Sequence, residues 1–91
     1  MQQYNIIITG KVQGVWFRKY TQEKAQQLNL YGFVMNKDDG SVYTEAVGTN
    51  EQLKNFVHWL ETEGSPLSVV SNVKVTIANN VLAYTKFSIK K

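Results

Sequence analysis

The chain has no cysteine, and only one proline, one histidine and one arginine occur among its 91 residues. Without cysteine there is no disulfide, no thiolate nucleophile and no thiolate metal ligand. A small domain that folds without disulfides fits a reducing compartment, and the first residues lack the pattern of a signal peptide, so we expect a cytoplasmic protein. No apolar run approaches the roughly 20 residues that span a bilayer, so we expect no membrane partner.

Charged residues are also sparse, and they are scattered. Ten Lys and Arg against seven Asp and Glu give a net charge of +3, and the only adjacent basic pairs are Arg18–Lys19 and Lys90–Lys91. A nucleic-acid-binding surface usually gathers its basic residues on one face or helix. The charge pattern therefore favours a small anionic ligand and predicts no nucleic-acid partner.

The length fits one domain, residues 1–91, in which strand and helix patterns alternate. Apolar spacing of about one turn predicts two helices, the second of which starts with a capping box formed by Thr49 and Gln52. We expect Gly32 to end the first helix, and Gly64 with Pro66 to end the second. The expected helices are 17–29 and the segment from Thr49 to Gly64, and the expected strands are 4–9, 33–37, 41–47, 69–77 and 84–89.

The order of these elements predicts an α+β fold. Asp38-Asp39-Gly40 between two strand-like segments is a strong hairpin signal, because the tight turn needs positive φ angles. The order β-α-β-β-α-β with one further strand fits a ferredoxin-like sandwich, with two helices on one face of a mainly antiparallel sheet of four to five strands. Parity places one set of residues on a single face of the fourth strand: Val69, Ser71, Val73, Val75 and Ile77.

The most informative segment is the loop from Gly10 to Arg18. A strand, a glycine-containing loop and a helix point unpaired N–H groups toward an anion, and the only arginine follows in the first helical turn. A guanidinium binds two oxygens of a phosphate or carboxylate, which a lysine ammonium cannot do. The segment is neither a Walker A loop nor a dinucleotide-binding fingerprint. On spacing alone, a turn shaped by Gly10 and Gly14, with Arg18 paired to a surface carboxylate, is an equal alternative.

Two longer motifs distinguish these alternatives. Gly10-Lys-Val-Gln-Gly-Val-Trp-Phe-Arg18 resembles the G-x-V-Q-G-V-x-F-R signature of acylphosphatases. Gly32-Phe-Val-Met-Asn36, followed by Asp39-Gly40-Ser-Val42, is similar to the second signature of that family. The resemblance implies an enzyme that hydrolyses the carboxyl–phosphate bond of small acyl phosphates, releases inorganic phosphate, and uses no metal or other cofactor. It also implies a monomer.

The resemblance further implies a role for each motif residue. Arg18 would hold the substrate phosphate, and Asn36 would position the attacking water through its side-chain amide, which both donates and accepts hydrogen bonds. The backbone N–H groups that complete the phosphate site would be those of Gln13, Gly14, Val15, Trp16, Phe17 and Arg18. Trp16 fills the variable position of the first signature, where an indole either narrows the mouth of the site or stacks against an aromatic acyl group.

Other candidates carry less weight. His58 is expected on a helix surface, and Asp38 and Asp39 are expected to shape the hairpin rather than act as an acid–base pair. The aromatic residues, Trp16 among them, are expected at core and boundary positions. RNA binding is disfavoured because Met35 stands where a second stacking aromatic is required. A noncatalytic anion-binding module remains the rival from another functional class.

Overall fold

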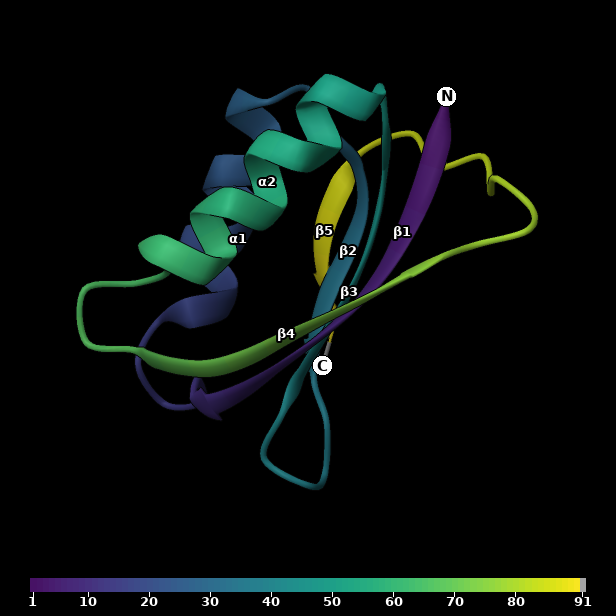
Figure 1. Ribbon diagram of the computed structural model, residues 1–91. Coiled ribbons are helices and arrows are strands. Elements are labelled where there is room, and N and C mark those ends of the chain that lie inside the picture. The colour runs from purple at the N-terminus through teal and green to yellow at the C-terminus, as the bar shows by residue number, and fades with distance from the viewer. Residues whose placement is uncertain (91) are drawn as a thin grey trace.

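Two helices cover one face of a five-stranded sheet in the computed structural model, which describes residues 1–90 (Figure 1). Lys91, the second member of the Lys90–Lys91 pair, lies outside the described residues. None of the helices in residues 1–90 has the length and apolar character needed to cross a membrane. The elements are β1 (Gln2–Lys11), α1 (Phe17–Gln27), β2 (Tyr31–Asn36), β3 (Val42–Gly48), α2 (Asn50–Thr62), β4 (Val69–Ile77) and β5 (Phe87–Lys90).

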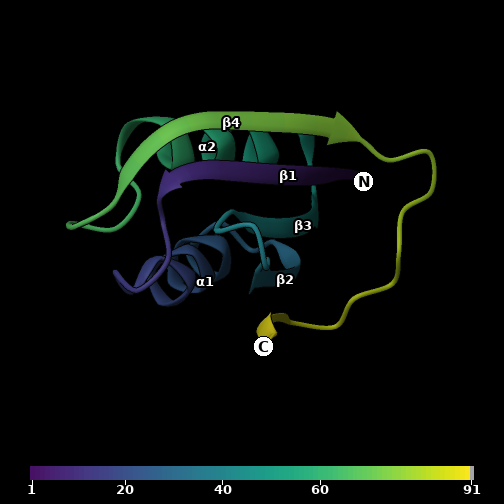
Figure 2. The same cartoon turned by 90° about the horizontal axis from the view of Figure 1, so that it is seen from below.

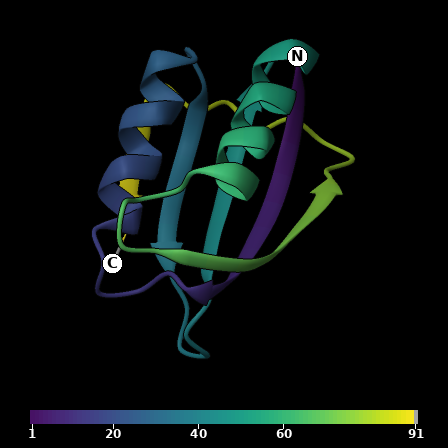
Figure 3. The same cartoon turned by 60° about the vertical axis from the view of Figure 1, so that its left-hand side comes forward.

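The strand order across the sheet is β4-β1-β3-β2-β5. All neighbours are antiparallel except β2 and β5, which are parallel. The two edge strands are joined by residues 78–86, which cross from one side of the sheet to the other (Figure 2). Helix α1 packs over β2 and β5, and α2 packs over β3 and β4, so the helices lie side by side in front of the sheet (Figure 3). This is the ferredoxin-like α+β architecture expected from the sequence.

The core lies between the helices and the sheet. Phe17 at the start of α1 packs against Trp59 of α2, with ring centroids 6.5 Å apart, and Phe56 packs edge-on against Phe87 of β5 at 6.1 Å. The first contact fixes the start of α1, which follows the loop after β1, and the second fixes the start of β5 against α2. The rest of the fully buried apolar core includes Ile6, Ile8, Val12, Val34, Val42, Ala25, Leu53 and Leu60.

The start of α2 agrees with the sequence prediction, whereas the end of α1 differs from it. The Thr49–Gln52 capping box is present at the start of α2. Gly32, however, does not end α1, because it lies within β2. Asn29 adopts the left-handed conformation instead (φ 58°), and the N–H of Leu30 donates to the carbonyl of Ala25 at 2.9 Å, which is a Schellman motif with asparagine in the usual glycine position.

The predicted face of β4 is wrong in part. A register shift between Thr9 and Gly10 of β1 brings Gly10 opposite Val70, whereas Ile8 pairs with Val73. The bulge breaks the parity of β4, so Val70 and Val73 pack against the core and Val69 is exposed. Strand alternation in the sequence cannot reveal this shift, because it arises from pairing with β1.

Gly32 is required by close packing between β2 and β3. Its φ is +142°, and an added Cβ would overlap the carbonyl oxygen of Glu45 and lie 2.8 Å from its carbonyl carbon. We expect Gly32→Ala to lower the free energy of unfolding by about 3 kcal/mol or more, because the strained backbone and the overlap act together. Urea denaturation measures this effect. Gly40→Ala is the control, since Gly40 also has positive φ (+92°) but no atom within 4 Å of an added Cβ. Equal losses in the two variants would contradict the packing argument.

Candidate active site

The loop that joins β1 to α1 is rigidly placed by the residues around it. Val12, Val15 and Phe17 are all buried, so their packing in the core fixes the backbone between them. Gly14 (φ +73°) and Trp16 (φ +63°) both adopt the left-handed conformation that turns the chain into the helix. For a residue such as tryptophan this conformation costs roughly 1–2 kcal/mol.

The loop presents a row of unsatisfied N–H groups. Within residues 1–90, the backbone N–H groups of residues 13–16 donate no hydrogen bond to another backbone group. Phe17 and Arg18 follow in the first turn of α1, where N–H groups have no intrahelical partner. Successive free N–H groups at a helix N-terminus form a concave, electropositive site that suits an anion.

Side-chain hydrogen bonds join this loop to two other segments. The buried hydroxyl of Ser65 donates to the carbonyl of Val15 at 2.9 Å, which joins the loop to the segment after α2. The side-chain amide of Gln13 donates to the carbonyls of Lys37 at 2.8 Å and Ser41 at 2.9 Å, which joins it to the β2–β3 hairpin. The loop and the end of β2 are therefore held in one arrangement, so an anion site at the loop needs little reorganisation.

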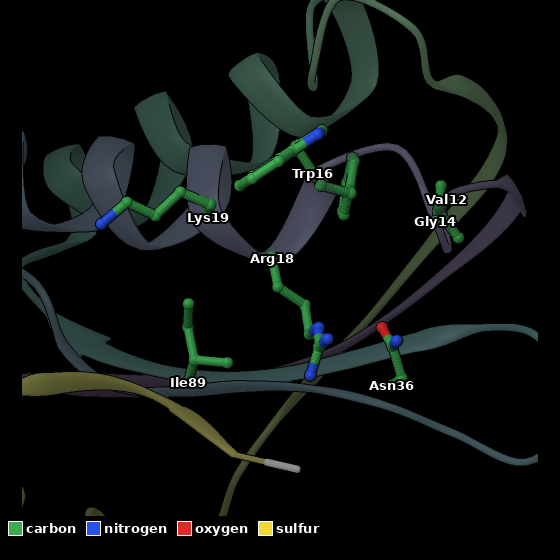
Figure 4. Close-up of a pocket in the computed structure, with 8 residues that line it drawn as sticks. Val12, Gly14, Trp16, Arg18, Lys19, Asn36 and Ile89 are labelled. Atoms are coloured by element: carbon green, nitrogen blue, oxygen red, sulfur yellow. The ribbon is translucent and has the colours of Figure 1, made fainter.

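Arg18 and Asn36 meet at this loop. Both line a cavity of about 420 Å³ together with Gly14, Trp16 and Phe17. The Arg18 side chain extends from the first turn of α1, and Asn36, the last residue of β2, points toward it (Figure 4).

The hydrogen bonds of these two side chains differ. The Arg18 Nη1 atom donates to the carbonyl of Lys90 at 3.3 Å. The Asn36 Oδ1 atom is buried and has no hydrogen-bond partner among the described residues. A buried polar atom without a partner is uncommon in a native structure, and such atoms occur where a ligand or water is to be bound.

The carbonyl that holds Arg18 belongs to a well-anchored strand. The Lys90 ammonium lies 3.8 Å from the centre of the Phe33 ring, and Phe33 also packs against Tyr43 and Tyr84, each at 5.9 Å. Both tyrosine hydroxyls donate to Glu45 at 2.5 Å. Burial, followed by the hydrogen bond to Glu45, raises the pKa of Tyr84 to about 12, and the same causes raise the pKa of Tyr43. Both phenols therefore remain protonated donors at neutral pH.

The hairpin beside the site is shaped by Asp39. Its Oδ1 atom accepts hydrogen bonds from the Ser41 hydroxyl at 2.5 Å and the Ser41 N–H at 2.9 Å. These bonds lower the pKa of the Asp39 carboxyl below its ordinary value. The carboxylate thus stabilises a turn that also presents the Ser41 carbonyl to Gln13.

The structure brings most of the expected site residues to one place. Gly14, Trp16, Phe17, Arg18 and Asn36 line the cavity, and Gln13 lines an adjoining hollow with Arg18 and Asn36. Val15 lines neither of them, and its side chain is buried. Sequence reasoning missed the supporting groups, namely the Gln13 side chain, Ser65 and the Lys90 carbonyl.

The expectation for Trp16 is wrong, and the expectation for His58 is confirmed. Trp16 is not a core or boundary residue, because 74% of its surface is exposed. His58 lies on the exposed surface of α2, as expected. Among the described residues, no group of three or more His, Cys, Asp or Glu side chains is arranged to hold a metal ion.

This fold and cavity define a ferredoxin-like protein with a candidate active site at its first strand-to-helix loop. The Acylphosphatase family model matches residues 4–89. An acylphosphatase of Bacillus licheniformis is 44% identical over 89 residues, covering 98% of both chains. Acylphosphatase-1 of Mus musculus is also 44% identical, over 92% of this chain and 87% of its own. The crystal structure of acylphosphatase from Bacillus subtilis superimposes with a TM-score of 0.96 at 41% identity, over 100% of both chains. The chain belongs to the acylphosphatase family.

Proposed function

We propose that this acylphosphatase hydrolyses acyl phosphates by holding the phosphate between the loop N–H groups and Arg18 while Asn36 positions the attacking water. The observation that supports this proposal is the convergence of three elements on one cavity. These are the loop that carries the N–H groups of residues 13–18, the guanidinium of Arg18, and the amide oxygen of Asn36, which has no partner among the described residues. Each element corresponds to one requirement of the reaction.

The first requirement is stabilisation of charge on the three phosphoryl oxygens. Fixed N–H dipoles do this without reorganisation during the reaction, provided that the loop is rigid. Here the loop is held by Ser65 and Gln13, and the guanidinium is oriented by the Lys90 carbonyl. Arg18 adds a permanent charge and a planar pair of donors that match two phosphate oxygens.

The second requirement is a water molecule placed in line with the bond that breaks. The Asn36 amide accepts a hydrogen bond from this water through Oδ1, which satisfies the atom that is otherwise unpaired. Water oxygen attacks phosphorus, the bond from phosphorus to the bridging oxygen breaks, and the electron pair leaves with the carboxylate. The water proton passes to a nonbridging phosphate oxygen, so no strong protein base is needed.

The direct test is hydrolysis of acetyl phosphate by the purified protein, followed by release of inorganic phosphate, with and without an excess of EDTA. We expect turnover at the same rate in both conditions, because the groups assigned to the reaction are all amino-acid groups. Loss of turnover with EDTA that returns on addition of a divalent metal would contradict this mechanism. Binding of phosphate without turnover would instead favour a noncatalytic module.

The proposal extends to the setting in which the enzyme works. The substrates are small acyl phosphates, and the product besides the carboxylate is inorganic phosphate. The absence of cysteine suits a reducing compartment, which supports a cytoplasmic location. The scattered positive charges support a small anion rather than a nucleic acid or membrane as the partner. We expect the chain to act as a monomer, which size-exclusion chromatography with light scattering tests.

A further inference from the structure

Lys19 brings a primary amine to the cavity that holds Arg18 and Asn36. It follows Arg18 in the first turn of α1, and its side chain is exposed. Among the described residues, Lys19 is the one lysine that lines this cavity. The proposed hydrolysis assigns no step to it. Lys19 is therefore an unused nucleophile at the place where an acyl phosphate, itself an electrophile, is proposed to bind.

An acyl phosphate has two electrophilic atoms. In the proposed hydrolysis, water attacks phosphorus and the acyl group leaves as a carboxylate. A neutral amine that attacks the carbonyl carbon instead forms a carbon–nitrogen bond and breaks the bond from that carbon to the bridging oxygen. The electron pair leaves with inorganic phosphate, which also takes up the proton that the amine loses. The products are an N-acyl-lysine and inorganic phosphate, and no other reactant is needed.

The geometry of the hydrolysis directs the carbonyl carbon toward Lys19. In-line attack places the water and the bridging oxygen on opposite sides of phosphorus. Because Asn36 is assigned to the water, the acyl group must extend away from Asn36. In Figure 4, Asn36 lies on one side of the Arg18 guanidinium, whereas Lys19 and Ile89 lie on the other. Both of these residues line the cavity, so the acyl group leaves the phosphate on the side where the amine is found.

The mobility of the Lys19 side chain brings its amine within reach. In Figure 4 the ammonium points away from Arg18. An exposed side chain changes rotamer within nanoseconds, whereas a typical turnover takes about a millisecond or longer, so the amine samples the cavity while substrate is bound. Lys37 is placed differently, because it lines the adjoining hollow next to Asn36, on the side of the water. Its ammonium lies 5.9 Å from the centre of the Tyr43 ring.

From this placement we propose that Lys19 is an acylation site, modified by the acyl phosphate that is bound in the enzyme's own cavity. This inference rests on the proposed function, since the carbonyl carbon is placed relative to the phosphate and the water. Acylation converts the ammonium into a neutral amide. It therefore removes a positive charge next to Arg18 and weakens the attraction of the cavity for an anionic substrate. Prolonged exposure to acyl phosphate then lowers the activity of the enzyme.

The test incubates the protein with acetyl phosphate and measures acetylation of each lysine by peptide mass spectrometry. Lys54 is the internal reference, because it is exposed on α2 and does not line the cavity. We expect Lys19 to be acetylated on the order of tenfold faster than Lys54 in the wild type, since binding places the carbonyl beside its amine. The ratio should persist in Asn36→Ala, which lacks only the group assigned to the water. It should fall to about one in Arg18→Ala, and also in the wild type with excess inorganic phosphate.

Activity after preincubation gives an independent measurement. The wild type should lose part of its starting kcat/KM after incubation with acetyl phosphate and desalting. Lys19→Arg keeps a positive charge without an amine that forms a stable amide, so it should retain its own starting value, whereas Lys54→Arg, the matched control, should decline like the wild type.

Two kinds of failure are distinguishable. Equal acetylation of Lys19 and Lys54 in the wild type, or a ratio that Arg18→Ala and excess phosphate leave unchanged, would overturn the acylation site while hydrolysis of acetyl phosphate still supported the proposed function. A decline in Lys19→Arg equal to that of the wild type would also count against the site. A wild type that acetylates Lys19 selectively but does not hydrolyse acetyl phosphate would overturn the proposed hydrolysis instead.

Discussion

Replacing Arg18 by lysine is expected to lower kcat/KM for acetyl phosphate by on the order of 10²-fold, although the charge is retained. In the proposed mechanism the guanidinium meets two phosphate oxygens with two donors in a fixed plane, and the Lys90 carbonyl at 3.3 Å orients it. A lysine ammonium is a point charge on a flexible stem, so it satisfies neither condition. Arg18→Ala should lose more, because it also removes the charge.

Steady-state kinetics and competition by inorganic phosphate measure this effect together. Both Arg18 variants should be inhibited by phosphate more weakly than the wild type, since the same donors hold substrate and product. Lys54→Gln removes one positive charge from the exposed surface of α2 and serves as the control for net charge. Full activity of Arg18→Lys would show that charge alone is sufficient and that the bidentate geometry is unnecessary.

Replacing Asn36 by alanine is expected to lower kcat by on the order of 10²-fold while leaving inhibition by inorganic phosphate nearly unchanged. The amide is assigned to the water and not to the phosphate, so its loss should affect the chemical step more than binding. The buried, unpartnered Oδ1 atom is the structural reason for this assignment. Alanine removes that acceptor and leaves the water without a fixed position.

The control for Asn36→Ala is Asn55→Ala, which changes the same residue type on the exposed surface of α2. Urea denaturation of both variants separates a loss of catalysis from a loss of folded protein. Weakened phosphate inhibition in parallel with kcat would mean that Asn36 binds the phosphate and not the water. Retention of wild-type kcat would remove Asn36 from the mechanism.

Local chemistry made several features predictable from the sequence. The capping box at Thr49 and Gln52 depends on residues three apart, so it can be predicted before the fold is known, and the structure confirms it. The order of strands and helices was likewise predicted from the local spacing of apolar residues. The two signature motifs located the loop and Asn36, and the structure places them around one cavity.

Features that depend on distant parts of the chain were not predictable. The bulge opposite Gly10 is created by pairing between β1 and β4, and it overrides the alternation within β4. Asn29 ends α1, whereas Gly32 lies within β2, where that strand closely approaches β3. The exposure of Trp16 depends on the left-handed backbone at the start of α1, which no propensity for tryptophan would indicate.

The hydrogen bond between Arg18 and the Lys90 carbonyl has a consequence for the order of events during synthesis. The two residues are 72 positions apart, and β5 joins the sheet beside β2 only after every other strand has been made. At about 5–20 residues per second, a ribosome adds Lys90 roughly 4 to 14 seconds after Arg18. During that interval the nascent chain carries the complete loop motif, but its arginine lacks the carbonyl that orients it. Catalytic competence should therefore arise late, with the docking of the last strand, rather than when the signature motif emerges.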